Sequence, residues 1–543
     1  MTDLDHELDA RREANVLDVA PSRTKGRRSA PRYERPLSPA VVAPRSSLGP
    51  HAVTVAYAVV GFAGALLISA SAPVWRNAAP SWRLTVPGIP HPGSSATAAT
   101  LFALGMLAMC VGWIGLVGRS ERMPGSERTR RNAIVLVLCL WALPPLLATP
   151  LLSNDSYSYS AQGEMASRGI DPTAQGPYAL SRGPFLRAAD PIWRDAPAPY
   201  GPVSVSLSKW AVEASGHDPA ISVWLMRALA LAGVVMSAVG VAVLARQHRV
   251  SQATALAVGL ASPLVLIHLL GGSHNDALML GLTAVGLALF GKDRKVLGAA
   301  LVIAAVGVKL PAIIALGFLG WNWFGPGTAV ARRFVSAASV TAVAAGILGA
   351  MSVVVGIGMG WVTALSSTGK VTSTLSPTTK LGFVVSDGLD AIGLSVSSDV
   401  TVAAFRLLGL LAALGIISYL LVRSPEQGMV RGIGLSLVAL VILGPVIWPW
   451  YLPAGFALLA ASGLGKWRPT YLVLVIAASF FVWPTSVNPV TSLQSYQHLL
   501  GFLAILGIAA AAVVAQHLAV RSGRWRARRD DLRSGVLVRV PAR

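Results

Sequence analysis

The chain has 543 residues, of which 54% are hydrophobic and only 13% are charged. Runs of about 20 apolar residues recur along it, which excludes an ordinary soluble core, because a soluble helix keeps a polar face. The net charge of +21 comes from 45 basic and 24 acidic residues. Since the basic residues lie in short segments between the apolar runs, we attribute them to membrane topology and expect no nucleic-acid partner.

The two ends of the chain differ from its centre. Residues 1–50 are rich in Arg, Pro and Ala and lack an apolar core, so we expect no cleavable signal peptide there. Their composition predicts a disordered, basic cytoplasmic tail, and residues 521–543 predict a second basic cytoplasmic tail. We therefore expect residues 51–520 to form the membrane domain.

The apolar runs predict an all-α polytopic membrane protein with about 14 transmembrane helices. The predicted spans are residues 52–72, 97–118, 132–152, 220–245, 252–271, 275–290, 296–308, 311–324, 333–357, 400–422, 429–447, 450–463, 469–485 and 498–520.

Two apolar stretches contain a proline break. The stretch 296–324 is interrupted at Lys309–Pro311, and the stretch 432–463 is interrupted at 448–453. Proline removes a helical donor and clashes with the preceding turn, so each stretch is predicted to form two short helices or a re-entrant hairpin. A broken helix is tolerated at membrane depth only where it lines a protein or water cavity. The breaks therefore predict a polar cavity.

Clusters of basic residues orient the predicted spans. They lie at 118–131, 246–249, 291–295, 331–333, 423–431, 465–468 and 521–529. All of them fall on one side, which the positive-inside rule assigns to the cytoplasm together with both termini. The loops 153–219 and 358–399 then lie on the extracytoplasmic side, as does the predicted cavity.

Asp155 follows the third predicted span, in a chain that is poor in acids. A carboxylate at the edge of a low-dielectric cleft can serve as a general base. Tyr157 and Tyr159 follow it closely. The alternative is a helix end at the membrane interface, where tyrosines are common. Glu164 and Asp171 come later in the same segment and are expected chiefly to shape the loop.

The segment "GGSHNDALM" at 271–279 joins two predicted spans. Gly271 and Gly272 can end a helix, and the residues from Ser273 to Asp276 fit a capping box that opens the next one. Capping requires neither His274 nor Asn275, so these side chains are also candidates for contacts with sugar hydroxyls or phosphate.

Lys309 lies at the first proline break, where it either snorkels to the interface or offers an ammonium to a phosphate. Trp448 and Tyr451, at the second break, are either interfacial aromatics or platforms for a sugar. The sequence contains no Walker motif, dinucleotide fingerprint or zinc-type spacing, so the ligand is not expected to be a cytosolic nucleotide.

Four segments together resemble a known family: "SNDSYSYSAQGEMASRGIDP", "PIWRDAPAPYGPVSV", "GGSHNDALM" and "VKLP". They are similar to the actinobacterial polyprenol-phosphomannose-dependent α-1,6-mannosyltransferases, integral-membrane glycosyltransferases of the GT-C class. The resemblance extends from about residue 50 to about residue 520. It implies an extracytoplasmic active site in the plasma membrane, with Asp155 at the position of the essential acid. Two predicted spans precede the part of the chain that corresponds to the usual GT-C core.

The resemblance also implies a reaction. A polyprenyl phosphomannose would donate mannose to a phosphatidylinositol mannoside or lipomannan acceptor, forming an α-1,6 linkage with inversion at the anomeric carbon. Asp155 would take the acceptor's proton, and Lys309 with the helix start at 275–276 would stabilise the leaving phosphate. No cofactor is expected, and a divalent cation is not favoured. The residues expected to bind substrate are Tyr157, Tyr159, Gln162, Glu164, Tyr200, His274, Asn275, Asp276, Lys309, Lys380, Trp448 and Tyr451.

Two other functions stay open at this point. A GT-C enzyme that uses another lipid-linked sugar, such as arabinose, would carry the same features. A lipid or solute transporter would also use broken helices and charges in a cavity. Transporters are disfavoured because the sequence shows no internal repeat and its polar groups gather at the ends of the spans.

Overall fold

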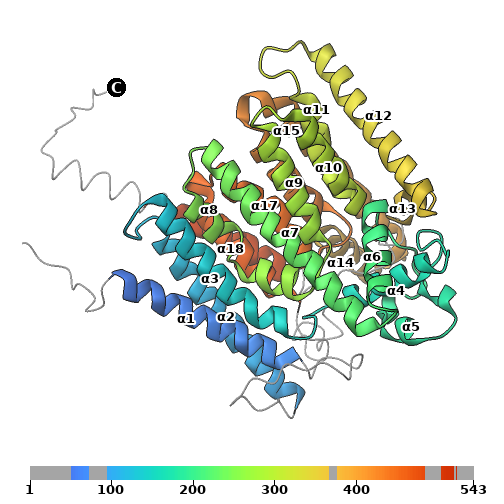
Figure 1. Ribbon diagram of the computed structural model, residues 1–543, viewed down its shortest axis with the longest axis horizontal. Coiled ribbons are helices and arrows are strands. Elements are labelled where there is room, and N and C mark those ends of the chain that lie inside the picture. The colour runs from blue at the N-terminus through green and yellow to red at the C-terminus, as the bar shows by residue number, and fades with distance from the viewer. Residues whose placement is uncertain (1–49, 73–93, 366–375, 483–502, 519–520, 522–543) are drawn as a thin grey trace, which may run out of the picture. The chain divides into compact units, whose positions relative to one another are not determined.

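The computed structural model describes residues 50–72, 94–365, 376–482, 503–518 and 521. These residues form helices and no strands (Figure 1), which confirms the all-α prediction. Apart from Pro50 and Arg521, the two predicted cytoplasmic tails lie outside the described residues.

The helices up to the middle of the chain are α1 (Pro50–Ser71), α2 (Ser95–Arg119), α3 (Glu127–Leu147), α4 (Asp155–Ser167), α5 (Pro184–Ala188), α6 (Pro202–Ala214), α7 (Pro219–Gln247), α8 (Gln252–Gly259) and α9 (Asp276–Phe290). The later ones are α10 (Lys295–Val308), α11 (Ile313–Trp321), α12 (Val330–Val355), α13 (Gly360–Thr363), α14 (Pro377–Ala391), α15 (Ser398–Gln427), α16 (Met429–Leu443), α17 (Leu452–Ser462) and α18 (Arg468–Ser479). A last apolar helix covers Leu503–Leu518.

Within the described residues, six helices are long and apolar enough to cross a membrane. They are α1, α2, α3, α7, α12 and α15. The bent pair formed by α8 and the π-helix η4 (Leu264–Gly271) makes a seventh if it is one span. The chain is therefore a multi-pass helical membrane protein. Helices also occupy the other predicted spans, but they are shorter, and fourteen crossings stay a prediction.

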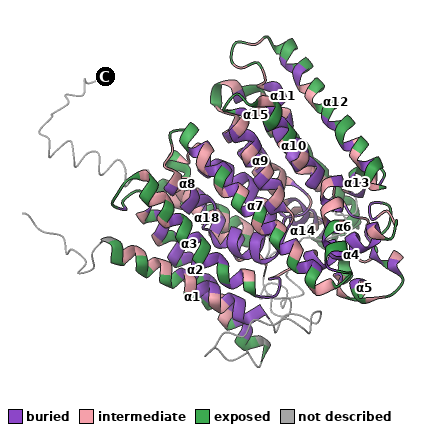
Figure 2. Ribbon diagram, viewed as in Figure 1, coloured by how far each residue is buried: buried purple, intermediate pink, exposed green. Residues whose placement is uncertain are grey.

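Burial distinguishes the central helices from the peripheral ones. Figure 2 shows α12 with most of its surface exposed and α9 largely buried. The helix α17 is also largely buried. The exposed residues of α12 include many apolar ones, such as Val353 and Val354. An apolar, exposed helix is stable only against lipid, so α12 presents its face to the bilayer.

Both predicted proline breaks are confirmed. The helix α10 ends at Val308, Lys309 is extended, and a 3-10 turn (η5, Leu310–Ala312) leads into α11. The helix α16 ends at Leu443, and a second 3-10 turn (η7, Pro449–Tyr451) leads into α17.

A third break was not predicted. The single span expected at 252–271 consists of α8 and η4, which meet at an angle of 62°. Pro263 begins the second piece, and its missing N–H explains why the first helix cannot continue through it.

The segment 153–219 folds into short helices instead of an open loop. The helices α4, α5 and α6 lie together beside the end of α7 (Figure 1). The loop before α6 ends at Gly201, because Pro202 occupies the first turn of α6, where a helix tolerates proline.

Candidate active site

The helix α4 is polar and yet almost completely buried. The residues from Ser156 to Ala166 are all buried, and α4 packs on α6 and α7. Gly163 allows the close approach to α6, since a Cβ added there would lie 2.3 Å from the carbonyl oxygen of Ser208. A polar helix of this kind does not cross the bilayer. It is held by protein on all sides, with Asp155 as its first residue.

Asp155 has partners from two distant segments. Its Oδ1 accepts a hydrogen bond from Nε1 of Trp193 at 3.2 Å, and its Oδ2 lies 3.4 Å from Nδ1 of His274. Burial alone would raise the pKa of Asp155, but His274, Lys309 and Trp193 favour the ionised form and lower the pKa below its ordinary value. The side chain retains 13% exposure. Asp155 is thus an ionised carboxylate with access to solvent.

His274 lies behind Asp155, within an aromatic stack. Its side chain is completely buried, and its ring stacks on Trp450 at 3.9 Å between centroids. Trp450 stacks in turn on Trp448 at 5.0 Å. These rings fix the imidazole plane, so that Nδ1 is directed toward Asp155.

Two helix breaks and one helix start supply the groups opposite Asp155. Asp276 starts α9 after the turn that follows η4, the α10–α11 break carries Lys309, and the α16–α17 break carries Tyr451. Nζ of Lys309 lies 2.7 Å from Oδ2 of Asp276 and 4.3 Å from the centroid of the Tyr451 ring. Both charged side chains are nearly buried, at 10% and 4% exposure. Such a pair persists in a low-dielectric setting because each charge compensates the other.

Two tyrosines complete the contacts around the acid. The rings of Tyr159 and Tyr200 meet edge to face at 5.2 Å. The hydroxyl of Tyr159 donates to Oδ1 of Asn275 at 3.5 Å, and Nδ2 of Asn275 donates to Oγ of Ser204 at 3.3 Å. Burial raises the pKa of both phenols well above the ordinary value, so they remain neutral hydrogen-bond donors and acceptors.

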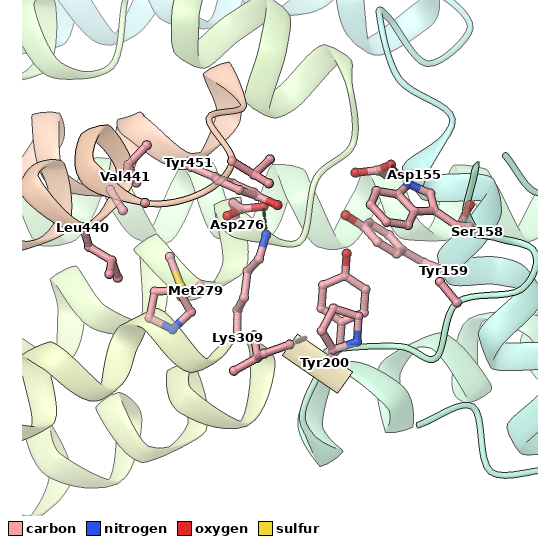
Figure 3. A pocket seen from close by; sticks show the side chains of 18 of the residues that line it. Asp155, Ser158, Tyr159, Tyr200, Asp276, Met279, Lys309, Leu440, Val441 and Tyr451 are labelled. Carbon is pink, nitrogen blue, oxygen red and sulfur yellow. Dashed lines mark hydrogen bonds and ion pairs between the residues drawn. The ribbon is translucent and has the colours of Figure 1, made fainter. Parts of the chain in front are cut away.

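These groups surround a cavity of about 220 Å³ with two unlike walls. We call one the polar wall; it consists of Asp155, Ser158, Tyr159, Gln162, Trp193 and Tyr200. The other, the apolar wall, consists of Met279, Leu437, Leu440, Val441, Val446 and Ala454. Lys309, Asp276 and Tyr451 lie between them, as Figure 3 shows. A cavity of this kind fits a molecule with a polar head and an apolar tail.

The structure brings most of the predicted site residues to this cavity and leaves others outside it. Its lining includes Asp155, Tyr159, Gln162, Tyr200, Asp276, Lys309 and Tyr451. His274 and Trp448 belong to the stack behind it. Asn275 lines a small neighbouring pocket that also contacts Tyr159. Tyr157 and Lys380 are buried and do not line the cavity.

Glu164 also lies away from the cavity. Its Oε1 accepts from Nε of Arg168 at 2.8 Å, and its Oε2 lies 2.6 Å from Nδ1 of His217. Asp171 accepts from the backbone N–H of Thr173 and, at 3.1 Å, from that of Gly358. Both acids therefore hold loop segments in place.

The capping box expected at 273–276 is not formed. Asn275 occupies the N-cap of α9 without a side-chain hydrogen bond. Oγ of Ser273 accepts instead from Nε of Arg227, and Asp276 pairs with Lys309. The capping interpretation was wrong because these side chains satisfy partners on other helices.

The sequence did not single out Trp193 or the apolar wall. Trp193 ends a 3-10 turn (η3, Pro191–Trp193) that lies against α4, because the N–H of Asp190 donates to Oγ of Ser158 at 3.2 Å. The only available signal was a tryptophan between prolines, close after the acidic helix. Within the described segments, no three His, Cys, Asp or Glu side chains lie close enough together to hold a metal ion.

Comparison with known families assigns the class of protein. A model described as "Alpha-(1->6)-mannopyranosyltransferase, N-terminal domain" matches residues 58–325, and one described as "MptB C-terminal domain" matches residues 378–521. Together with the helical membrane fold, these matches define an integral-membrane glycosyltransferase. The chain belongs to the α-(1→6)-mannopyranosyltransferase family.

Individual relatives agree with this assignment. The α-(1→6)-mannopyranosyltransferase A of Mycobacterium tuberculosis is 30% identical over 443 residues, which cover 75% of this chain and 82% of the relative. The α-(1→6)-mannopyranosyltransferase B of Corynebacterium glutamicum is 30% identical over 486 residues, 78% of this chain and 76% of the relative. No solved structure matches the chain.

Proposed function

We propose that this protein transfers mannose from a polyprenyl phosphomannose to a phosphatidylinositol mannoside or lipomannan acceptor, with an α-1,6 linkage and inversion at the anomeric carbon. The observation that carries the proposal is the cavity, in which an ionised acid and a buried ammonium lie beside an apolar wall. The family names support α-1,6-mannosyl transfer. A lipid-linked donor accounts for the apolar wall.

Asp155 acts as the general base. The 6-hydroxyl of the acceptor gives its proton to Asp155 while its oxygen forms the new bond to the anomeric carbon. The bond from that carbon to the donor phosphate breaks, and its electron pair leaves with the polyprenyl phosphate. One displacement of this kind inverts the centre and needs a single base. The lowered pKa of Asp155 keeps it ionised and ready to accept the proton at neutral pH.

Lys309 stabilises the leaving phosphate. Its ammonium is held by Asp276 and lies over the ring of Tyr451. A fixed charge in a low-dielectric cavity stabilises the charge that develops on the leaving group. This assignment needs no divalent cation.

The apolar wall accommodates the lipid chain of the donor. Leu437, Leu440 and Val441 lie along α16, one of the shorter apolar helices. A polyprenyl chain that lies against them would place its phosphate near Lys309.

The protein is proposed to reside in the plasma membrane as a GT-C enzyme, with its cavity on the extracytoplasmic face. The basic clusters at 118–131, 246–249 and 291–295 support this orientation, because such clusters mark cytoplasmic loops. Both termini then lie in the cytoplasm.

The test uses the full chain, purified in lipid nanodiscs. Either polyprenyl phosphomannose or polyprenyl phosphoarabinose is supplied as the donor with a phosphatidylinositol mannoside as the acceptor, and the product linkage is determined by methylation analysis. We expect α-1,6-linked mannose from the wild type and none from Asp155→Ala. Transfer only from a polyprenyl phosphoarabinose, or no transfer at all, would refute the proposed donor. The same assay with a chelator tests the metal-free assignment, which a loss of transfer would refute.

A further inference from the structure

Arg227 lies inside α7, one of the helices that can cross the membrane. Its side chain is among the largest that are fully buried, with 1% exposure. A guanidinium at this place is costly unless protein groups solvate it. Its hydrogen-bond partners therefore indicate what it does.

The partners of Arg227 are the ends of two other helices. Its Nη1 donates to the carbonyl oxygen of Leu146 at 2.9 Å and also to that of Ala148. Its Nη2 donates to the carbonyl oxygen of Gly271 at 3.2 Å, and its Nε donates to Oγ of Ser273 at 3.0 Å. One side chain thus binds the last turn of α3, the end of η4, and Ser273, which lies two residues beyond that end.

These carbonyl groups need an external donor. The last carbonyls of a helix have no partner within it, and the residue four positions after Leu146 is Pro150, which has no N–H. The two helix ends also carry the negative ends of their dipoles, which a cation stabilises. Arg227 supplies the donors and the charge together.

The two helix ends lead directly to the site. The end of α3 is followed by Asp155, and the end of η4 is followed by His274. The N–H of Leu151 donates to Gly271 at 2.9 Å, which joins the two connecting segments. The distance of 3.4 Å between Asp155 and His274 therefore depends on how α3 and η4 are held together.

We infer that Arg227 is a positioning residue, which holds the Asp155 segment and the 271–276 segment in the relative position that the reaction requires. The inference rests on the proposed role of Asp155. Lysine cannot replace arginine here, because one ammonium on a flexible stem cannot reach carbonyls on two helices in a fixed geometry.

Arg333 provides a matched control. It is buried as well, with 6% exposure, and it donates to the carbonyl oxygens of Trp321, Gly325 and Thr328 at 2.8, 2.9 and 3.1 Å. Trp321 ends α11, Gly325 and Thr328 lie in the loop between α11 and α12, and none of the three lines the cavity. Arg333→Lys thus removes the same kind of bond without touching the site.

The experiment compares Arg227→Lys with Arg333→Lys in nanodiscs. Hydrogen exchange is measured by mass spectrometry, and kcat and KM are measured with polyprenyl phosphomannose. For Arg227→Lys we expect faster exchange in peptides that cover 149–157 and 270–277, with kcat lower by about 100-fold and KM nearly unchanged, because misplacing a reacting group by about 1 Å has that effect. For Arg333→Lys we expect faster exchange only around 320–330 and kcat close to that of the wild type.

Three outcomes would overturn the inference: unchanged exchange in Arg227→Lys, faster exchange with a normal kcat, or an equal loss of kcat in Arg333→Lys. Should Arg227→Lys fail to fold, Ser273→Ala removes a single acceptor, and normal exchange and kcat in that variant would overturn the inference as well. Absence of transfer by the wild type would refute the proposed function, whereas the exchange measurement still tests the role of Arg227 in holding the segments.

Discussion

Each end of α4 carries an acid, Asp155 partly exposed and Glu164 buried, and the two acids are held in opposite ways. Asp155 contacts an indole N–H and a histidine and faces the cavity. Glu164 accepts from the guanidinium of Arg168 and from His217, and its side chain is 3% exposed.

The difference shows that burial alone does not make a base. A carboxylate whose oxygens are bound to a guanidinium has little remaining capacity to take a proton from a substrate. Asp155 is ionised through several weaker contacts, and it keeps an accessible face. Four substitutions test this contrast between Asp155 and Glu164.

The largest effect is expected for Asp155→Asn. The amide keeps the shape of the side chain but cannot take a proton, so kcat for mannose transfer should fall by about 10³-fold. Radiolabelled donor measures the transfer, and the thermal midpoint checks that the variant is folded. A variant that retains about a tenth of the wild-type kcat would show that another group is the base.

Lys309→Met should come next. It removes the charge opposite Asp155, and kcat should fall by about 100-fold, as it does when one stabilising group for a developing charge is lost. The single change also leaves Asp276 buried without its partner. The double variant Lys309→Met with Asp276→Asn removes that penalty. We expect it to recover thermal stability and to stay inactive; recovered activity would contradict the role of Lys309.

Trp193→Phe should have a smaller effect, which the pH profile reveals. The substitution keeps a ring but removes the N–H that favours ionised Asp155, so the pKa of Asp155 rises. In the wild type, kcat falls as the pH drops through the lowered pKa, because the base becomes protonated. In the variant this acid limb should lie at higher pH. Trp210→Phe, on the exposed face of α6, serves as the control and should leave the limb in place.

Glu164→Gln should change activity least. It weakens the contacts with Arg168 and His217, which are both about half exposed, so the free energy of unfolding should decrease by only about 1 kcal/mol. We expect kcat within about threefold of the wild type, as for a group that takes no part in proton transfer. A loss of kcat as large as that of Asp155→Asn would abolish the contrast between the two acids.

Local sequence signals predicted the helices and two of the breaks. Pro311 and the prolines at 449 and 453 interrupt apolar stretches. Because a proline lacks an N–H, it disrupts helical hydrogen bonding whatever the surrounding structure, so its effect can be predicted from the sequence. The bend at Pro263 was missed because its flanks are uniformly apolar, so that no change in hydropathy marks it.

The contacts that build the site could not be predicted in the same way. Lys309 pairs with Asp276 across 33 positions, and the ring of His274 stacks on Trp450, which lies much further along the chain. Such contacts depend on how helices pack in three dimensions, and hydrophobic periodicity carries no information about them. For the same reason, the sequence could name Asp155 but not its hydrogen-bond donor Trp193.

The polar character of α4 has a consequence for biosynthesis. Apolar helices can enter the bilayer one by one as they leave the ribosome, and they associate afterwards. The helix α4 has no such option, because its Ser, Tyr and Gln side chains are buried only after α6 and α7 have been made. The facing group, Tyr451, is translated later still. A nascent chain that ends before Tyr451 therefore carries its acid without the opposite side of the cavity, and the enzyme becomes competent only near the end of its synthesis.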